Sequence, residues 1–349
     1  MYLKATTLDD LLVKVYSQLL KSKVRLKASK GWNVELSGVS LELTKPRARL
    51  SRTQVKGHIF SCLGELIWYL SGSNRVEPMT YYLSGYSRFA QRNGVVWGAY
   101  GPRIFGDTPS QYDVVLNTLR KKKTSRQAVF QLFDKRDIRK NYKDVPCTCT
   151  LQFLQRDGML HLIVHMRSND AYLGLPHDVF SFTMLQEIVA NELGYKIGSY
   201  KHLVGSLHLY DEHRDGAARF LAEGVQRTQP MPAMSTGSQQ ADIAQVKVIE
   251  EAIRTNGPSS IPVETTIATL SPFWGDMVRL LAIFSLTKDI PEAAPDGVRT
   301  DRLRRVVELQ AGLSNSYYKT YIRRRSQRME VAEQLNLINP PSVEQEEER

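Results

Sequence analysis

The stretch that decides the fold is Met166-Arg167-Ser168-Asn169-Asp170-Ala171-Tyr172-Leu173-Gly174-Leu175-Pro176-His177-Asp178-Val179-Phe180-Ser181-Phe182. Residues 160–165, just before it, are rich in β-forming side chains. Residues 180–193 predict a buried helix that Gly194 ends, because Phe180, Met184, Ile188 and Val189 lie on roughly one face. The stretch therefore joins a predicted sheet to a predicted buried helix.

Further strands are predicted on both sides of this stretch. Residues 128–133 and 148–154 share the β-rich composition of residues 160–165, which indicates a sheet. In residues 32–43, apolar and polar side chains alternate around Gly38, the pattern of a hairpin or a bent strand pair.

Two helices are predicted in the N-terminal part. Apolar residues recur at helical spacing over residues 11–20, behind the acidic Asp9 and Asp10, which indicates an amphipathic helix. A second helix is predicted at residues 58–70. Because strands and helices alternate irregularly, the pattern favours an α+β fold over a repeated βαβ array.

The chain shows neither an internal repeat nor a dividing linker. We expect a single domain over residues 1–340, with a surface insertion near residues 225–245. Residues 229–240 are the best candidate for a surface loop, and the polar, acidic residues 341–349 are expected to be disordered.

The composition excludes several classes of protein. With 42% apolar and 24% charged residues, the chain is neither disordered nor fibrous. A net charge of +11 points to an anionic partner: nucleic acid, a membrane surface or a phosphorylated small molecule. Three cysteines are too few for a disulfide framework and lack the spacing of a structural zinc site, so we expect no metal.

The N-terminal residues do not have the pattern of a signal peptide, and no apolar run approaches the ~20 residues that span a bilayer. We therefore expect a cytoplasmic protein with no membrane partner.

Cys147 follows Pro146 at the entry to an apolar strand, and Arg126 and Arg167 could supply positive potential that lowers the pKa of a thiol. Taken alone, a cysteine beside a strand is more often a small core residue. The surrounding motifs favour the reactive alternative.

Several motifs in order resemble the thymidylate synthase family. The family's Pro-Cys-His-x-x-x-Gln-Phe motif matches residues 146–153, its Gln-Arg-Ser-x-Asp-x-x-Leu-Gly-Leu-Pro-x-Asn motif matches residues 166–178, and its Gly-Asp-x-His-x-Tyr motif matches residues 205–210. Upstream, residues 64–70 resemble its His-Glu-Leu-Leu-Trp-Phe-Leu helix, and residues 97–101 its Gly-x-x-Tyr-Gly turn. The resemblance runs from about residue 30 to residue 215.

The resemblance implies a homodimeric enzyme with a large mixed sheet covered by helices. The thiolate of Cys147 would add to C6 of a pyrimidine nucleoside monophosphate, which makes C5 nucleophilic toward the one-carbon unit of 5,10-methylenetetrahydrofolate. Glu65 would organise water and protons near C4 and C5, and Tyr100 belongs to the same catalytic set.

The same resemblance assigns binding roles to residues that would otherwise be read as solvated or salt-bridged. The nucleotide and the folate would each be bound by a separate set of residues. The substrate-binding residues would be Arg167, Ser168, Gln152, His208 and Tyr210, with Arg126 from a second subunit, and the folate-binding residues Asp170, His58 and Gly174.

Asp178 stands where the synthase pattern has asparagine. A carboxamide donates and accepts, as uracil requires, whereas a carboxylate only accepts and suits the amino group of cytosine and a protonated N3. A mismatched buried polar group rejects the wrong base by ~10²-fold or more. The sequence therefore predicts a cytidylate or deoxycytidylate 5-hydroxymethyltransferase.

The family's closing Ala-Pro-Val segment is absent, which is consistent with water, rather than hydride, reaching the one-carbon unit. Smaller departures affect the phosphate site: Thr148 replaces a histidine, Gln127 replaces the second phosphate arginine, and Lys27 and Lys30 are the nearest cations to the N-terminal phosphate arginine. Ribose and deoxyribose both stay open, as does the downstream pathway.

Two alternatives remain. The enzyme alternative is a thymidylate synthase or a deoxyuridylate hydroxymethylase. The non-enzyme alternative is a nucleic-acid-binding protein, suggested by the basic runs 121–123 and 323–325. Both runs are short and lack interleaved aromatic residues, so solvated faces of a loop and a C-terminal helix are the preferred interpretation, and nucleic acid is an unlikely partner.

Overall fold

The computed structural model describes residues 1–28, 31–260, 262–288 and 296–327. Its centre is a seven-stranded mixed sheet with the strand order β1-β3-β7-β6-β5-β4, in which β2 pairs with β3. β1 is parallel to β3 and β6 to β7, whereas the other pairs are antiparallel. The strands are β1 (Tyr2–Ala5), β2 (Arg25–Ala28), β3 (Gly31–Leu43), β4 (Val129–Gln131), β5 (Thr148–Arg156), β6 (Met159–Asp170) and β7 (Lys196–Tyr210).

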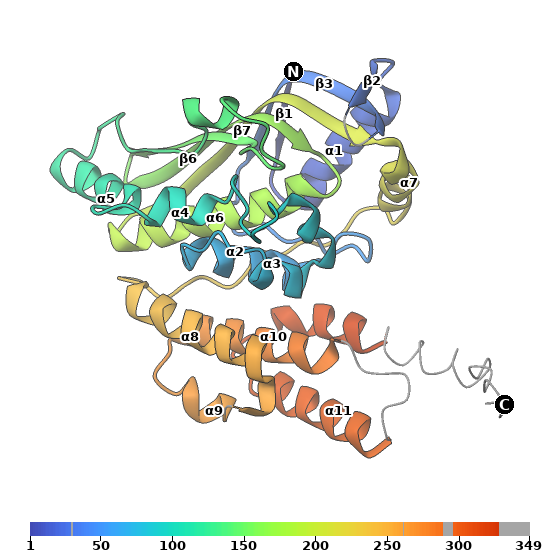
Figure 1. Ribbon diagram of the computed structural model, residues 1–349, viewed down its shortest axis with the longest axis vertical. Helices are drawn as coiled ribbons and strands as arrows, with labels where there is room; N and C mark the ends of the chain where they lie inside the picture. The colour runs from blue at the N-terminus through green and yellow to red at the C-terminus, as the bar shows by residue number, and fades with distance from the viewer. Residues whose placement is uncertain (29–30, 261, 289–295, 328–349) are drawn as a thin grey trace, which may run out of the picture.

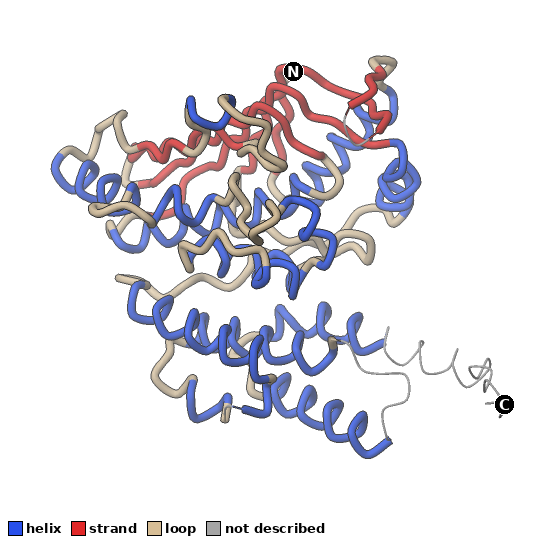
Figure 2. The backbone as a smooth tube through the Cα atoms, viewed as in Figure 1, coloured by secondary structure: helices blue, strands red, loops and turns tan. Residues whose placement is uncertain are grey.

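Helices cover one face of the sheet in successive layers (Figures 1 and 2). α6 packs on β6 and β7, α2 packs on α6, and α8 and α10 pack on α2. The helices are α1 (Leu8–Lys21), α2 (Ile59–Leu70), α3 (Glu77–Tyr82), α4 (Tyr100–Phe105), α5 (Gln111–Lys121), α6 (Gly174–Glu192), α7 (Arg214–Ala222), α8 (Gln240–Asn256), α9 (Val263–Thr266), α10 (Pro272–Thr287) and α11 (Asp296–Ala311). The predicted α+β fold with a large mixed sheet is confirmed.

The predicted N-terminal helices are present. α1 begins where the Thr7 hydroxyl accepts a hydrogen bond from the backbone N–H of Asp10, and it buries Leu11, Leu12 and Val15. α2 is apolar on nearly every side because it lies between α6 and the C-terminal helices. Gly64 within α2 allows close packing, since a Cβ there would lie 2.3 Å from the ring of Tyr82.

Two expectations about element boundaries are corrected. Residues 32–43 form one continuous strand, β3, and not a hairpin, because β7 pairs along most of its length; Gly38 takes a φ of 62° within it. α6 begins six residues before the predicted start, because the Asp170 carboxylate accepts hydrogen bonds from the N–H groups of Tyr172 and Leu173 just ahead of the helix. Asp178 therefore lies on α6.

Residues 225–239 contain no helix or strand, but they are not a wholly exposed loop. Met231 and Met234 are buried, and the N–H of Met234 donates to Glu187 of α6 over 3.1 Å. Glu187 also pairs with the buried Arg49. Residues 341–349 lie outside the described residues.

The C-terminal basic run is not a solvated face throughout. The Arg325 guanidinium lies over the rings of Phe284 and Phe60, 4.5 and 5.2 Å from their centroids, and Arg324 donates to the backbone oxygen of Thr53 over 2.9 Å. Arg325 therefore joins the C-terminal basic run to α2 and α10, and Arg324 joins it to the segment that precedes α2. Within the described residues, no helix is long and apolar enough to cross a membrane.

Lys56 lies in the segment that leads into α2 and is buried, with 2% of its surface exposed. Its ammonium group donates to the backbone oxygen of Tyr172 and lies against the Tyr172 ring. Burial lowers the pKa of Lys56 to about 7, although the nearby Asp170 opposes this shift.

Replacing Lys56 with methionine should stabilise the fold most at low pH. The unfolded lysine keeps its proton to a pKa of 10.5, whereas the folded one loses it near 7, so the penalty for burying the charge is complete below pH 7 and declines as the pH rises. We expect Lys56→Met to raise the free energy of unfolding by on the order of 2 kcal/mol at pH 6, with a smaller difference at pH 9. Urea titrations at both pH values check this, with the exposed Lys21→Met as control, and a difference that does not change with pH contradicts it.

Candidate active site

The ends of three strands meet at one edge of the sheet. β5 is antiparallel to β6 and β6 is parallel to β7, so the start of β5 lies beside the ends of β6 and β7. Thr148 pairs with Met166, and Asp170 pairs with His208. Cys147, which immediately precedes β5, therefore lies at the same edge as the polar residues that end β6 and β7.

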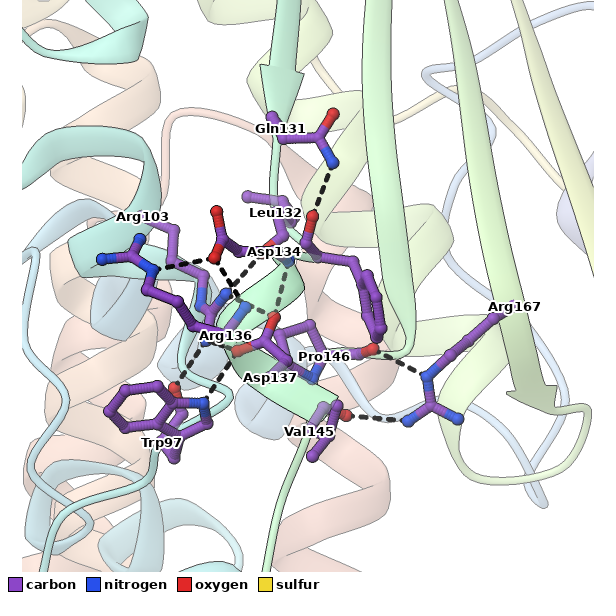
Figure 3. A network of polar contacts seen from close by, with 11 residues as sticks. Trp97, Arg103, Gln131, Leu132, Asp134, Arg136, Asp137, Val145, Pro146 and Arg167 are labelled. Atoms are coloured by element: carbon purple, nitrogen blue, oxygen red, sulfur yellow. Dashed lines mark hydrogen bonds and ion pairs between the residues drawn. The ribbon is translucent and has the colours of Figure 1, made fainter. Parts of the chain in front are cut away.

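Arg167 holds Cys147 through both its backbone and its side chain. Its N–H donates to the Cys147 oxygen over 2.9 Å, and its guanidinium donates to the backbone oxygens of Pro146 and Val145, each over 2.9 Å. Figure 3 shows these contacts of Arg167 with Pro146 and Val145. The same guanidinium lies 3.8 Å from the half-buried Cys147 sulfur. This places a fixed positive charge beside the sulfur, the environment in which a thiolate is stabilised.

A second network anchors the segment that leads to Cys147 (Figure 3). Arg103 of α4 donates two hydrogen bonds to the buried carboxylate of Asp137, over 2.7 and 2.9 Å, and Trp97 donates to it over 2.7 Å. The Trp97 ring also stacks on Tyr142 at 4.0 Å. Burial alone would raise the pKa of Asp137, but hydrogen bonds from Arg103 and Trp97, among others, hold it below its ordinary value. The ionised Asp137 thus anchors the start of the segment that leads to Cys147, and Arg167 holds the end of that segment at Val145 and Pro146.

Two buried carboxyl groups face the same region from different helices. Glu65 of α2 and Asp178 of α6 are each 8% exposed. Glu65 accepts a hydrogen bond from the Tyr69 hydroxyl over 2.6 Å, and Asp178 accepts one from the Asn169 amide over 2.7 Å. Burial raises the pKa of Asp178 well above its ordinary value, and the charge of Glu65 raises it further, against the effect of Asn169. Asp178 therefore retains a proton far more readily than an exposed aspartate.

Tyr100, the first residue of α4, links the carboxyl groups to the cysteine. Its hydroxyl accepts hydrogen bonds from the hydroxyl and the N–H of Thr148, over 2.9 and 3.3 Å. Burial raises the pKa of Tyr100, and the charges of Asp178 and Cys147 raise it further. The structure thus brings together all four predicted catalytic residues, and Thr148 replaces the family's histidine with a different hydrogen-bond donor.

Three predicted substrate-binding residues lie on the adjoining strand ends. Ser168 pairs with Ser206 across β6 and β7, and the rings of His208 and Tyr210 pack edge to face at 5.0 Å. Burial raises the pKa of Tyr210, and the charge of Asp170 raises it further, which places Tyr210 near the end of β6. Hydroxyl and imidazole groups suited to a sugar therefore lie beside the cysteine.

The three predicted folate-binding residues meet where β6 passes into α6. The Asp170 carboxylate accepts from the N–H of Leu173 over 3.0 Å, and the Leu173 oxygen lies 3.0 Å from a ring nitrogen of His177. The His177 ring stacks on that of His58, with 6.4 Å between the centroids. Glycine at position 174 suits this packing, since a Cβ would lie 3.0 Å from the Asn169 amide, a tight contact. A carboxylate beside two flat rings fits a pterin, which offers both hydrogen-bond donors and a ring face.

Arg126 and Gln152 are not brought to the cysteine of their own chain. Gln152 lies five residues along β5 from Cys147, about 17 Å away in an extended strand. Its side-chain amide donates to the backbone oxygen of Arg126 over 2.9 Å, and Val129 of β4 pairs with it. The role of Gln152 in substrate binding therefore stays a prediction, and the structure places its side chain against Arg126.

Sequence reasoning missed five residues that support the site. Arg103 and Asp137 carry no local signal because they meet only in the folded chain. Asn169, His202 and Tyr200 form a buried polar chain behind Asp178. His202 does leave a signal, since it is the polar member of an alternating inward-facing series in β7.

The sequence model of the thymidylate synthase family matches residues 38–257 of this chain. The match spans more than half of the chain, and it includes both networks around Cys147 and every predicted site residue. Members of this family are folate-dependent enzymes that transfer a one-carbon unit to C5 of a pyrimidine nucleotide. The chain belongs to the thymidylate synthase family.

Proposed function

We propose that the enzyme hydroxymethylates C5 of CMP or dCMP, using 5,10-methylenetetrahydrofolate and water and releasing tetrahydrofolate. The observation that carries this proposal is the buried carboxyl group of Asp178, at the position where the synthase motif has the asparagine that reads uracil. Three physical arguments support it.

The first argument concerns the base. Cytosine presents N3 as an acceptor and its amino group as a donor. The raised pKa of Asp178, caused by burial and by Glu65, favours a carboxyl group that brings its own proton. Such a group donates to N3 and accepts from the amino group. Whether the proton lies on Asp178 or on N3, the pair shares one proton and two hydrogen bonds.

The second argument concerns the covalent step. The Cys147 sulfur forms a bond to C6, and the π electrons of C5=C6 move to C5 and into the ring toward N3. The guanidinium of Arg167, 3.8 Å from the sulfur, stabilises the attacking thiolate. The proton shared between Asp178 and N3 stabilises the charge that develops in the ring. Loss of the C5 proton and departure of Cys147 later restore the aromatic ring.

The third argument concerns the second substrate. Methylenetetrahydrofolate supplies the one-carbon unit as an electrophile. Asp170, His58 and Gly174 would hold its pterin against α6. Glu65, fixed by the Tyr69 hydroxyl, would orient the water whose oxygen becomes the new hydroxyl group. The balance is one nucleotide, one methylenetetrahydrofolate and one water, giving the 5-hydroxymethyl nucleotide and tetrahydrofolate.

We also propose a homodimer in which Arg126 reaches the phosphate in the partner's site. The position of Arg126, far along the sheet from Cys147 of its own chain, supports a role in trans. The sheet face turned away from α6 carries the half-buried apolar residues Leu154, Ile163 and Leu203, which suit a self-complementary interface. Gln152 would hold the backbone of Arg126 and act on the substrate only indirectly.

Incubation of the protein with methylenetetrahydrofolate and CMP, dCMP or dUMP tests the reaction. We expect a cytosine nucleotide to gain CH₂O, about 30 Da, without the rise in absorbance that accompanies formation of dihydrofolate. Cys147→Ser should reduce turnover by at least ~10³-fold. Cys149→Ser is the matched control, because it removes the neighbouring thiol of β5, which lies near Arg167, and leaves the Cys147 sulfur in place. Conversion of dUMP alone, a methylated product or oxidation of the folate would refute the proposal.

Asp178→Asn tests the base assignment directly. Because a carboxamide presents the donor and acceptor that uracil needs, we expect the ratio of kcat/KM for cytosine over uracil nucleotides to fall by ~10²-fold. Competition between dCMP and dUMP in one reaction, read by mass, measures this ratio. An unchanged ratio in a folded variant removes the main argument for cytosine.

Co-expression of two inactive variants tests the role of Arg126 in trans. Arg126→Ala chains keep Cys147, and Cys147→Ser chains keep Arg126, so each mixed dimer has one intact site. Random pairing should restore about a quarter of the wild-type activity. No recovery, in mixed dimers separated by distinct tags, would show that Arg126 does not act across the interface.

A further inference from the structure

Behind Asp178 lies a chain of three buried polar side chains that runs from β7 through β6 to α6. The Tyr200 hydroxyl is 2.6 Å from Nδ1 of His202, Nε2 of His202 is 3.1 Å from Oδ1 of Asn169, and Nδ2 of Asn169 donates to Oδ2 of Asp178 over 2.7 Å. Tyr200 and His202 have no exposed surface, and Asn169 is 4% exposed. Because each of these buried groups is hydrogen-bonded to the next, the whole row has one set of donor and acceptor directions at a time.

The directions follow from the neutral state of His202 together with the orientation of the Asn169 amide, whose oxygen faces Nε2 of His202. Burial lowers the pKa of His202 to about 3, so the ring is neutral and has one N–H. With Nε2 as the donor to Asn169 Oδ1, Nδ1 accepts from Tyr200. The Asn169 amide is then fixed, because rotation by half a turn would bring N–H against N–H at His202 and leave the Asp178 oxygen facing a carbonyl. Nδ2 of Asn169 therefore points at Asp178.

This arrangement makes the two oxygens of Asp178 different. A carboxyl group that has one proton can carry it on either oxygen. With the proton on the oxygen that faces N3 the group pairs with cytosine, and with the proton on the other oxygen it pairs with uracil. The hydrogen bond from Asn169 keeps Oδ2 as an acceptor. Within the described part of the chain, no hydrogen bond reaches Oδ1, which leaves Oδ1 as the atom that offers the proton.

Glycine at position 174 gives Asn169 the space for this contact. A Cβ at Gly174 would lie 3.0 Å from Nδ2 of Asn169 and 3.5 Å from Oδ2 of Asp178. A Cβ at the start of α6 would therefore crowd the amide of Asn169, whereas its distance from Asp178 would be an ordinary contact.

We propose that Asn169, held by His202 and Tyr200, is a positioning residue that fixes which oxygen of Asp178 donates and thereby makes the site distinguish cytosine from uracil. The inference rests on the proposed role of Asp178 as the base-reading residue. It adds that aspartate at this position is not sufficient for selectivity, because the choice between the bases depends on a residue that does not touch the base.

The test measures base selectivity by equilibrium binding, without folate. Dissociation constants for CMP, dCMP, UMP and dUMP are obtained by calorimetry for the wild type, Asn169→Leu and His202→Leu. We expect both variants to lower the ratio of cytosine to uracil affinity by about tenfold. Thr183→Val is the matched control, since it removes a buried hydroxyl of α6 whose hydrogen bonds stay within the helix.

A conservative replacement separates positioning from mere damage to the core. His202→Gln retains an N–H for Asn169 Oδ1, so it should recover most of the selectivity that His202→Leu loses, at similar thermal stability. In turnover assays, KM for the nucleotide should change in both leucine variants while KM for the folate stays at the wild-type value. Should Asn169→Leu fail to fold, the two His202 variants carry the test.

The outcomes distinguish this inference from the proposed reaction. Absence of a 5-hydroxymethyl product from the wild type refutes the reaction and leaves the binding ratios to decide the role of Asn169. Unchanged ratios in folded Asn169→Leu or His202→Leu, or a wild type that binds both bases equally, overturn the inference. Loss of selectivity in Thr183→Val as well would assign the effect to general disturbance of α6 and would equally overturn it.

Discussion

Parallel strands cannot be joined by a tight turn, so the pairing of β6 with β7 requires a crossover connection, and α6 supplies it. This one constraint places the start of α6 at the edge of the sheet where β6 ends. Asp170 closes the strand and caps the turn into the helix, and Asp178 follows on the second turn. Antiparallel pairing of β5 then brings Cys147 to the same edge. The nucleophile and the base-reading carboxyl group, 31 positions apart in the sequence, meet for this reason.

Two buried carboxyl groups, those of Asp137 and Asp178, differ in which neighbours stabilise or oppose their negative charge. Asp137 is buried but ionised, because Arg103 and Trp97 supply hydrogen bonds and an opposite charge. Asp178 is buried beside another carboxyl group, Glu65, and among the described residues its hydrogen-bond partner is the neutral amide of Asn169, so the same burial favours the protonated form. The fold thus uses one carboxylate as an anchor and keeps another as a proton-bearing group, through the identity of its neighbours alone.

The C-terminal helices account for part of the basic composition. Arg324 donates to the backbone oxygen of Thr53, and Arg325 lies over the rings of Phe60 in α2 and Phe284 in α10. Both charges therefore serve packing within the chain. Arg167 and Arg103 hold the approach to Cys147. The exposed run 121–123 at the end of α5 keeps the solvated character expected of it. Part of the basic composition behind the net charge of +11 therefore serves contacts within the chain.

The sequence by itself determined the α+β class, the main helices, the family and the residues that meet around Cys147, because these depend on local periodicity and on motifs whose spacing is preserved along the chain. It did not determine where β3 and α6 begin and end, since pairing with β7 and the Asp170 cap decide those boundaries. Only the tertiary structure separated Gln152 and Arg126 from Cys147 and joined Arg103 to Asp137 and His202 to Asn169. Those relations depend on strand register and burial, which bring together residues with no regular spacing in the chain, and burial among carboxyl groups is also what raises the pKa of Asp178.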